Sequence, residues 1–169
     1  MNFKKSVQFF LFLFLMTLFF LPSCRKVPSA VQSEKENQFR SFIINHKFRA
    51  SAFYADQPID YITNDNVVKQ ETDLWQYVKS YITDDKDNFI SNSQVSIEQN
   101  ALKIPGNDSA ALNRVYSISS DAQRVYFDFV DYDYVPRRYS LQEFKDNYFL
   151  VYIDWPTGAK VFSKFELVQ

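Results

Sequence analysis

Apolar and polar positions alternate most clearly in the last third of the chain. Over residues 124–134, Val125, Phe127 and Phe129 fall on one side of an extended chain, and tyrosines and aspartates fall on the other. Segments 148–155 and 159–168 flank Pro156-Thr157-Gly158, whose proline and glycine suit a three-residue hairpin loop. This pattern predicts antiparallel strands joined by tight turns.

Two segments show features of helices instead. Apolar residues recur at helical intervals in the first of them: Val67, Leu74, Val78 and Tyr81. They form one apolar stripe, which predicts a long helix over about 66–82. In the second segment, Ser140 and Glu143 match a capping box, in which each side chain accepts a hydrogen bond from the other residue's backbone. A short helix over about 141–146 is therefore predicted.

These elements together predict an α+β domain with a mostly antiparallel sheet. The alternative is a β-sandwich that carries a helical insertion. Residues 25–38 are polar and have few large apolar side chains, so we expect residues 24–38 to form a flexible tether. The remaining residues, 39–169, are then a single globular domain.

The N-terminus has the features of an export signal. Lys4 and Lys5 precede an apolar run from 9 to 21, interrupted only by Thr17. As a helix this run would span roughly 20 Å, less than the ~30 Å hydrocarbon core of a bilayer. It suits a signal peptide better than a membrane span, and residues 1–23 are predicted to be removed.

The sequence Leu21-Pro22-Ser23-Cys24 resembles the lipobox of bacterial lipoproteins, in the looser form of Bacteroidetes. The resemblance implies cleavage before Cys24 and acyl chains on that cysteine, which anchor the protein in a membrane. The competing interpretation is an ordinary secretory signal with a cysteine near its cleavage site. Arg25 and Lys26 follow the cysteine where lipoproteins retained in the inner membrane have Asp. The resemblance therefore implies the outer membrane. Surface-exposed Bacteroidetes lipoproteins carry acidic residues just after the cysteine, and residues 25–28 lack them, which favours a domain that faces the periplasm over one on the cell surface.

Composition excludes several classes of function. Loss of residues 1–23 removes two lysines and no acid, so the net charge changes from −1 to −3, which disfavours nucleic-acid binding. The chain has only two glycines, Gly106 and Gly158, too few for a nucleotide-binding loop. With His46 as its one histidine and Cys24 as its one cysteine, it has no usual metal or nucleophile set. We expect no cofactor, no metal and no enzymatic activity.

Aromatic residues are the unusual feature, and exposed tyrosines often mark interfaces or glycan platforms. The candidate interaction surface is Tyr126, Tyr132, Tyr134, Tyr148, Tyr152 and Trp155. The sequence thus favours a non-enzymatic scaffold that binds another envelope protein, for example in a type VI secretion apparatus. The alternative is a glycan-binding or glycan-processing lipoprotein that uses nearby acids, Asp128, Asp131, Asp133 and Asp154. A competing structural explanation is that the tyrosines only cover the second face of a sheet.

Overall fold

A computed structural model of the protein describes residues 28–62, 66–130 and 132–168. Within them, nine strands form one antiparallel sheet in the order β2-β1-β3-β4-β5-β6-β7-β8-β9. The elements are α2 (Ala30–Ile43), β1 (Lys47–Ile62), β2 (Val68–Asp73), η1 (Trp75–Tyr77), α3 (Ser80–Thr83), β3 (Lys86–Phe89), β4 (Gln94–Glu98), β5 (Ala111–Ser120), β6 (Val125–Val130), β7 (Pro136–Lys145), β8 (Tyr148–Asp154) and β9 (Lys160–Leu167).

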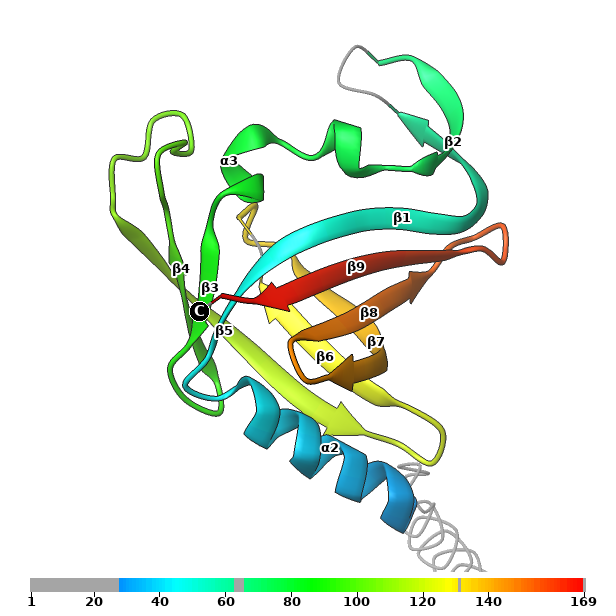
Figure 1. Ribbon diagram of the computed structural model, residues 1–169. Helices are drawn as coiled ribbons and strands as arrows, with labels where there is room; N and C mark the ends of the chain where they lie inside the picture. The colour runs from blue at the N-terminus through cyan, green and yellow to red at the C-terminus, as the bar shows by residue number, and fades with distance from the viewer. Residues whose placement is uncertain (1–27, 63–65, 131, 169) are drawn as a thin grey trace, which may run out of the picture.

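The sheet closes on itself because β1 is long enough to pair with three other strands. Its first residues pair with β3, residues 48–55 pair with β9, and its far end pairs with β2. Strands β1 and β3–β9 thus form a closed ring of eight strands, to which β2 is appended (Figure 1). A closed sheet of eight strands has an interior that side chains fill or that holds one small ligand.

The expected α+β class is therefore wrong, and so is the alternative of two stacked sheets. The segment 66–82 contains β2, η1 and the start of α3 in place of one long helix. Backbone pairing with the end of β1 determines its conformation, from Ile62 with Val68 to Ile59 with Glu71. The residues of the supposed stripe do not share one buried face, since Leu74 is fully buried whereas Val67 is 50% exposed. Tertiary pairing here overrides a helical pattern of apolar residues.

The expected short helix at 141–146 is also wrong, because these residues continue β7. Ser140 pairs with Tyr152 and Phe144 pairs with Phe149 in the ladder with β8. A register shift between Leu141 and Glu143 changes which residues face the interior. The bulge breaks the two-residue alternation, so Leu141 and Phe144 both pack on the core. This spacing of apolar residues resembles a helix although the chain is extended.

Residues 30–38, expected to be part of a flexible tether, belong to helix α2. Ser29 caps the helix by accepting a 3.2 Å hydrogen bond from the backbone N–H of Gln32. The polar residues that suggested disorder bind the sheet, since Ser120 Oγ donates to Glu36 and the Arg40 guanidinium donates to the Ile118 carbonyl. Helix α2 lies across one end of the closed sheet (Figure 1). The folded domain therefore begins before the expected boundary at Phe39.

The main core fills the half of the interior next to α2. Phe39 and Ile43 from the helix are fully buried against phenylalanines of the strands, among them Phe127 and Phe149. The predicted alternation of β6 is confirmed, because Val125, Phe127 and Phe129 are buried. The predicted turn at Gly158 is also confirmed, and the φ of this glycine is +89°. In the part of the chain that the structure describes, no helix is both long and apolar enough to span a membrane. Residues 1–23 and Cys24 lie outside the described residues.

Candidate functional site

A half-open cavity of about 440 Å³ is lined by residues of β1, of β9 and of the segment 75–82. In Figure 1 this segment lies on the far side of the sheet from α2. The cover of the cavity is the segment 74–85, here called the strap, which contains η1 and α3 and crosses above β1 (Figure 1). Ligand sites in proteins usually have volumes of roughly 300–1,000 Å³ and a mostly apolar wall with a few polar groups. The cavity is therefore large enough for one small molecule.

The floor of the cavity consists of phenylalanines that rest on the main core. Phe165 stacks on Phe149 with ring centroids 4.7 Å apart, and Phe129 stacks on Phe127 at 5.6 Å. Phe53 of β1 adds a third phenylalanine ring. Ala50 and Ser163 also line the cavity, and their side chains are too short to reach its opposite side. The cavity exists because small side chains face the interior beside these rings.

The strap is held at both of its ends. At one end Leu74 is fully buried, and its backbone N–H donates to the Phe53 carbonyl at 3.0 Å. Near this end the ring of Tyr77 in the strap stacks on that of Tyr61 in β1, with centroids 5.2 Å apart. At the other end the backbone N–H of Leu102 donates to the Asp84 carboxylate at 3.1 Å. Between these ends Trp75, Tyr77, Val78, Tyr81 and Ile82 line the cavity from above. The strap thus supplies an aromatic roof.

A buried carboxylate forms part of the wall at the α3 end. Asp85 is only 3% exposed, and it accepts hydrogen bonds from the Tyr132 hydroxyl at 3.0 Å and from the Asn100 N–H at 3.2 Å. Burial raises the pKa of the Asp85 carboxyl above its ordinary value, although both hydrogen bonds lower it. Burial is the largest of these influences, since removal from water disfavours the charged form. The wall of the cavity thus contains a carboxyl group whose charged form is disfavoured by burial.

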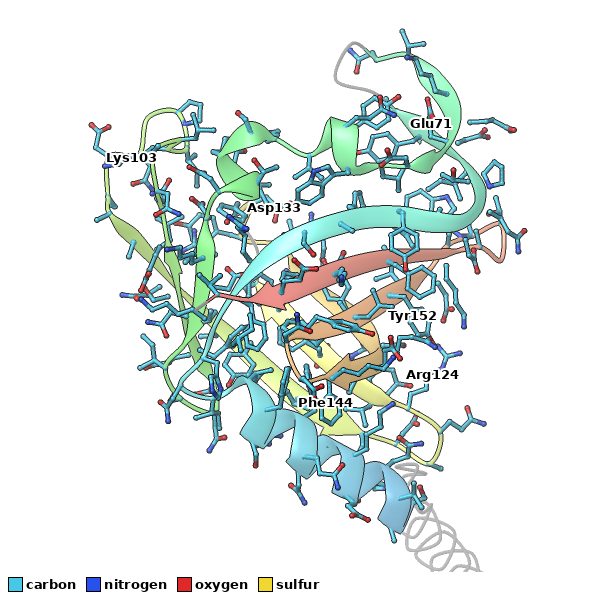
Figure 2. All side chains as sticks on the ribbon, viewed as in Figure 1. Glu71, Lys103, Arg124, Asp133, Phe144 and Tyr152 are labelled. Carbon is cyan, nitrogen blue, oxygen red and sulfur yellow. The ribbon has the colours of Figure 1, made fainter. Side chains whose placement is uncertain are left out.

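An ion pair stands at the same end of the cavity. The Arg137 guanidinium donates two hydrogen bonds to the Asp133 carboxylate, one at 2.9 Å, and this pairing lowers the pKa of Asp133 to about 2. Figure 2 shows Asp133 below α3, and Glu71 at the β2 end of the strap. Asp87 of β3, 8% exposed, also lines the cavity. Charged groups thus gather near α3, while the roof near β2 is aromatic.

The structure does not bring the predicted interaction residues together on one surface. Tyr132 turns into the cavity wall, and Tyr134 is 69% exposed in the turn after β6, under the Arg114 guanidinium at 4.0 Å. Trp155 packs against the second core cluster, which contains Leu74 and Val161. The remaining three tyrosines lie on the outer face of the sheet, where Tyr126 and Tyr148 are half-buried and Tyr152 is only 6% exposed.

Basic side chains cover those outer tyrosines. Arg138 lies 5.0 Å from the ring centroid of Tyr126, and Lys160 lies 4.5 Å from that of Tyr152. Tyr148 has Lys164 at 4.8 Å. Figure 2 shows Arg124 close to Tyr152 on the outside of β8, consistent with their 5.8 Å separation. Whether this charged and aromatic face binds a partner stays a prediction.

The candidate acids are also dispersed. Asp128 pairs with Arg138 at 2.7 Å and Asp154 pairs with Arg124 at 2.6 Å, both outside the cavity, and Asp131 lies outside the described residues. His46 is exposed in the turn between α2 and β1. Within the described ranges, no three His, Cys, Asp or Glu side chains gather as a metal site would require. Asp85 and Asp87, which sequence reasoning missed, are the acids that line the cavity together with Asp133.

No protein-family model, no curated protein and no solved structure matches this chain. The cavity and its residues therefore carry the functional argument.

Proposed function

We propose that this protein binds a small amphipathic molecule in the cavity between the phenylalanine floor and the strap. The cavity itself is the single observation that carries the proposal. The cavity is half open to solvent and lies beside a well-packed core, and its volume of about 440 Å³ falls in the range of roughly 300–1,000 Å³ that is usual for concave small-molecule sites.

The composition of the wall supports an amphipathic ligand. The floor and roof offer aromatic faces from Phe53, Phe165 and Trp75, whereas the α3 end offers the carboxylate of Asp85 and the Arg137–Asp133 pair. A ligand with an apolar body and one polar end would cover the rings and meet the polar groups at the same time. Small-molecule sites combine apolar walls and a few polar groups in this way.

A sugar is the second candidate ligand, and it continues the glycan alternative from the sequence. The stacked rings of Tyr61 and Tyr77 and the acids Asp85 and Asp87 line the same cavity. Aromatic faces and carboxylates are the groups that contact the apolar face and the hydroxyls of a sugar ring. Neutral monosaccharides therefore form a separate arm of the binding test.

The expected lipid anchor is part of the proposal. Cys24 precedes the start of α2 at Ala30 by six residues, which reach at most about 20 Å when extended. Because α2 lies at the opposite end of the closed sheet from the strap, an anchor at Cys24 would hold α2 near the membrane and leave the strap on the far side. Labelling with a palmitate analogue should be lost in Cys24→Ala, and equal labelling of both proteins would contradict the anchor.

A cavity-blocking variant tests the proposed binding site. Ser163→Phe places a large ring in the cavity, whereas Ser117→Phe adds the same ring to an exposed position on β5. A ligand present at about 100 times its dissociation constant stabilises a protein by about 2.7 kcal/mol and raises its melting temperature by several degrees. Compounds that stabilise the wild type and Ser117→Phe should not stabilise Ser163→Phe.

Thermal melts with small amphipathic compounds and with monosaccharides provide the measurement. Ser163→Phe must first melt within a few degrees of the wild type without ligand, which shows that it is folded. Equal stabilisation of both phenylalanine variants would place binding outside the cavity and contradict the proposal.

A further inference from the structure

The carboxylate of Asp85 has no basic partner in the part of the chain that the structure describes. Its two hydrogen-bond donors, Tyr132 and Asn100, are uncharged, and the neighbouring charge that acts on it is that of Asp84, another acid. An ionised carboxylate has room for about four hydrogen bonds, so two donors leave capacity unused. A buried charge of this kind normally has a counter-charge.

The basic residues around the cavity have described partners other than Asp85. Arg137 forms the ion pair with Asp133, and Arg114 lies over Tyr134 outside the cavity wall. Lys79 is exposed, with its ammonium 5.9 Å from the ring centroid of Tyr81. Among the described residues that line the cavity, three acids therefore face two bases, and one of those bases is already paired.

The tyrosine that bonds to this carboxylate packs against a second tyrosine. The rings of Tyr81 and Tyr132 lie 5.9 Å apart, and the hydroxyl of Tyr132 is bonded to Asp85. The faces of such rings attract cations, and the attraction grows when water is excluded. Asp85, Tyr81 and Tyr132 line the same cavity, so a carboxylate and a pair of packed tyrosine rings are available there to a protonated amine.

We infer that the polar end of the ligand is a protonated amine that donates to Asp85 beside Tyr81 and Tyr132, while its apolar body lies against Phe53 and Phe165. The inference rests on the proposed function and specifies the chemical class of the ligand. An alcohol would supply a hydrogen bond without the charge, and a carboxylate would be repelled by Asp85.

Three probes that share a phenyl-alkyl body test the inference: 4-phenylbutylamine, 4-phenylbutan-1-ol and 4-phenylbutanoate. Equilibrium dialysis against the full chain in detergent, with protein-free micelles as the partition reference, gives the three affinities at neutral pH, where an alkylamine is fully protonated. The amine should bind at least about tenfold more tightly than the alcohol, as expected for a hydrogen bond between charged groups. The carboxylate should bind no more tightly than the alcohol.

Asp85→Asn should abolish the preference for the amine and leave the affinity for the alcohol within about threefold. Asparagine can still accept from the Asn100 N–H and donate to the Tyr132 oxygen, so this variant should fold, and a thermal melt checks that it does. Asp154→Asn removes an exposed acid outside the cavity and should keep the preference.

The outcomes separate this inference from the proposed function. If the alcohol or the carboxylate binds as tightly as the amine, and Ser163→Phe abolishes that binding, the amine inference is wrong and the cavity remains the site. The inference is equally wrong if Asp85→Asn folds and keeps the amine preference. If no probe binds, or if Ser163→Phe binds all of them normally, the proposed function fails as well.

Discussion

Phe39→Ala is expected to lower the free energy of unfolding by about 3–5 kcal/mol, as for other fully buried phenylalanines. The ring of Phe39 is 0% exposed and lies 5.4 Å from that of Phe149 and 5.5 Å from that of Phe144. Its removal would leave a cavity between α2 and the end of the closed sheet. Chemical denaturation of the two proteins measures the difference.

The same helix provides a matched control. Val31 is 71% exposed, so Val31→Ala should change the stability by no more than about 0.5 kcal/mol. A loss below about 1 kcal/mol for Phe39→Ala would contradict the packing of α2 against the core.

Leu74→Ala is expected to cost about 2–5 kcal/mol, with the loss concentrated in the strap. Leu74 is fully buried in the second core cluster, next to Ile59 and Val161, and it anchors one end of the strap. Hydrogen exchange should therefore become faster in residues 75–83 than in the strands of the main core. Local opening of this kind is common in segments held by few buried contacts.

Val68→Ala is the control for that substitution, since Val68 precedes the strap in β2 and is 59% exposed. It should leave exchange in the strap unchanged. If Leu74→Ala accelerates exchange equally throughout β5, β6 and β8, the strap and the closed sheet unfold as one unit, and the separate role of the strap is wrong.

Individual strands and turns can be predicted from the sequence where their conformation depends on residues that are neighbours in the chain. The alternation of Val125, Phe127 and Phe129 predicts β6, and the turn at Gly158 predicts the hairpin between β8 and β9. Both depend on neighbouring residues only, namely the two-residue period of a strand and the backbone freedom of glycine. The helix over 66–82 fails because pairing with the distant end of β1 determines that segment.

The candidate site could not be derived in the same way. Its floor, roof and polar wall come from Phe53, Phe165, Trp75 and Asp85, which meet only because β1 and β9 pair and close the sheet. Tyr132 is the one member of the predicted interaction set that lines the cavity. The buried Asp85 sits in a polar stretch, Asp84-Asp85-Lys86-Asp87, where the local pattern indicates an exposed turn. Only the tertiary fold shows that it faces inward.

Tryptophan fluorescence tests the central claim most directly, because Trp75 lines the cavity and Trp155 does not. In Trp155→Phe, titration with 4-phenylbutylamine should produce a saturable change in the emission of Trp75. The double variant Trp155→Phe/Ser163→Phe should show no change in the emission of Trp75. In Trp75→Phe, where Trp155 is the remaining tryptophan, the amine should not change the emission. A response of Trp155 alone, or a Trp75 response that persists with Ser163→Phe, would contradict a ligand site between the phenylalanine floor and the strap.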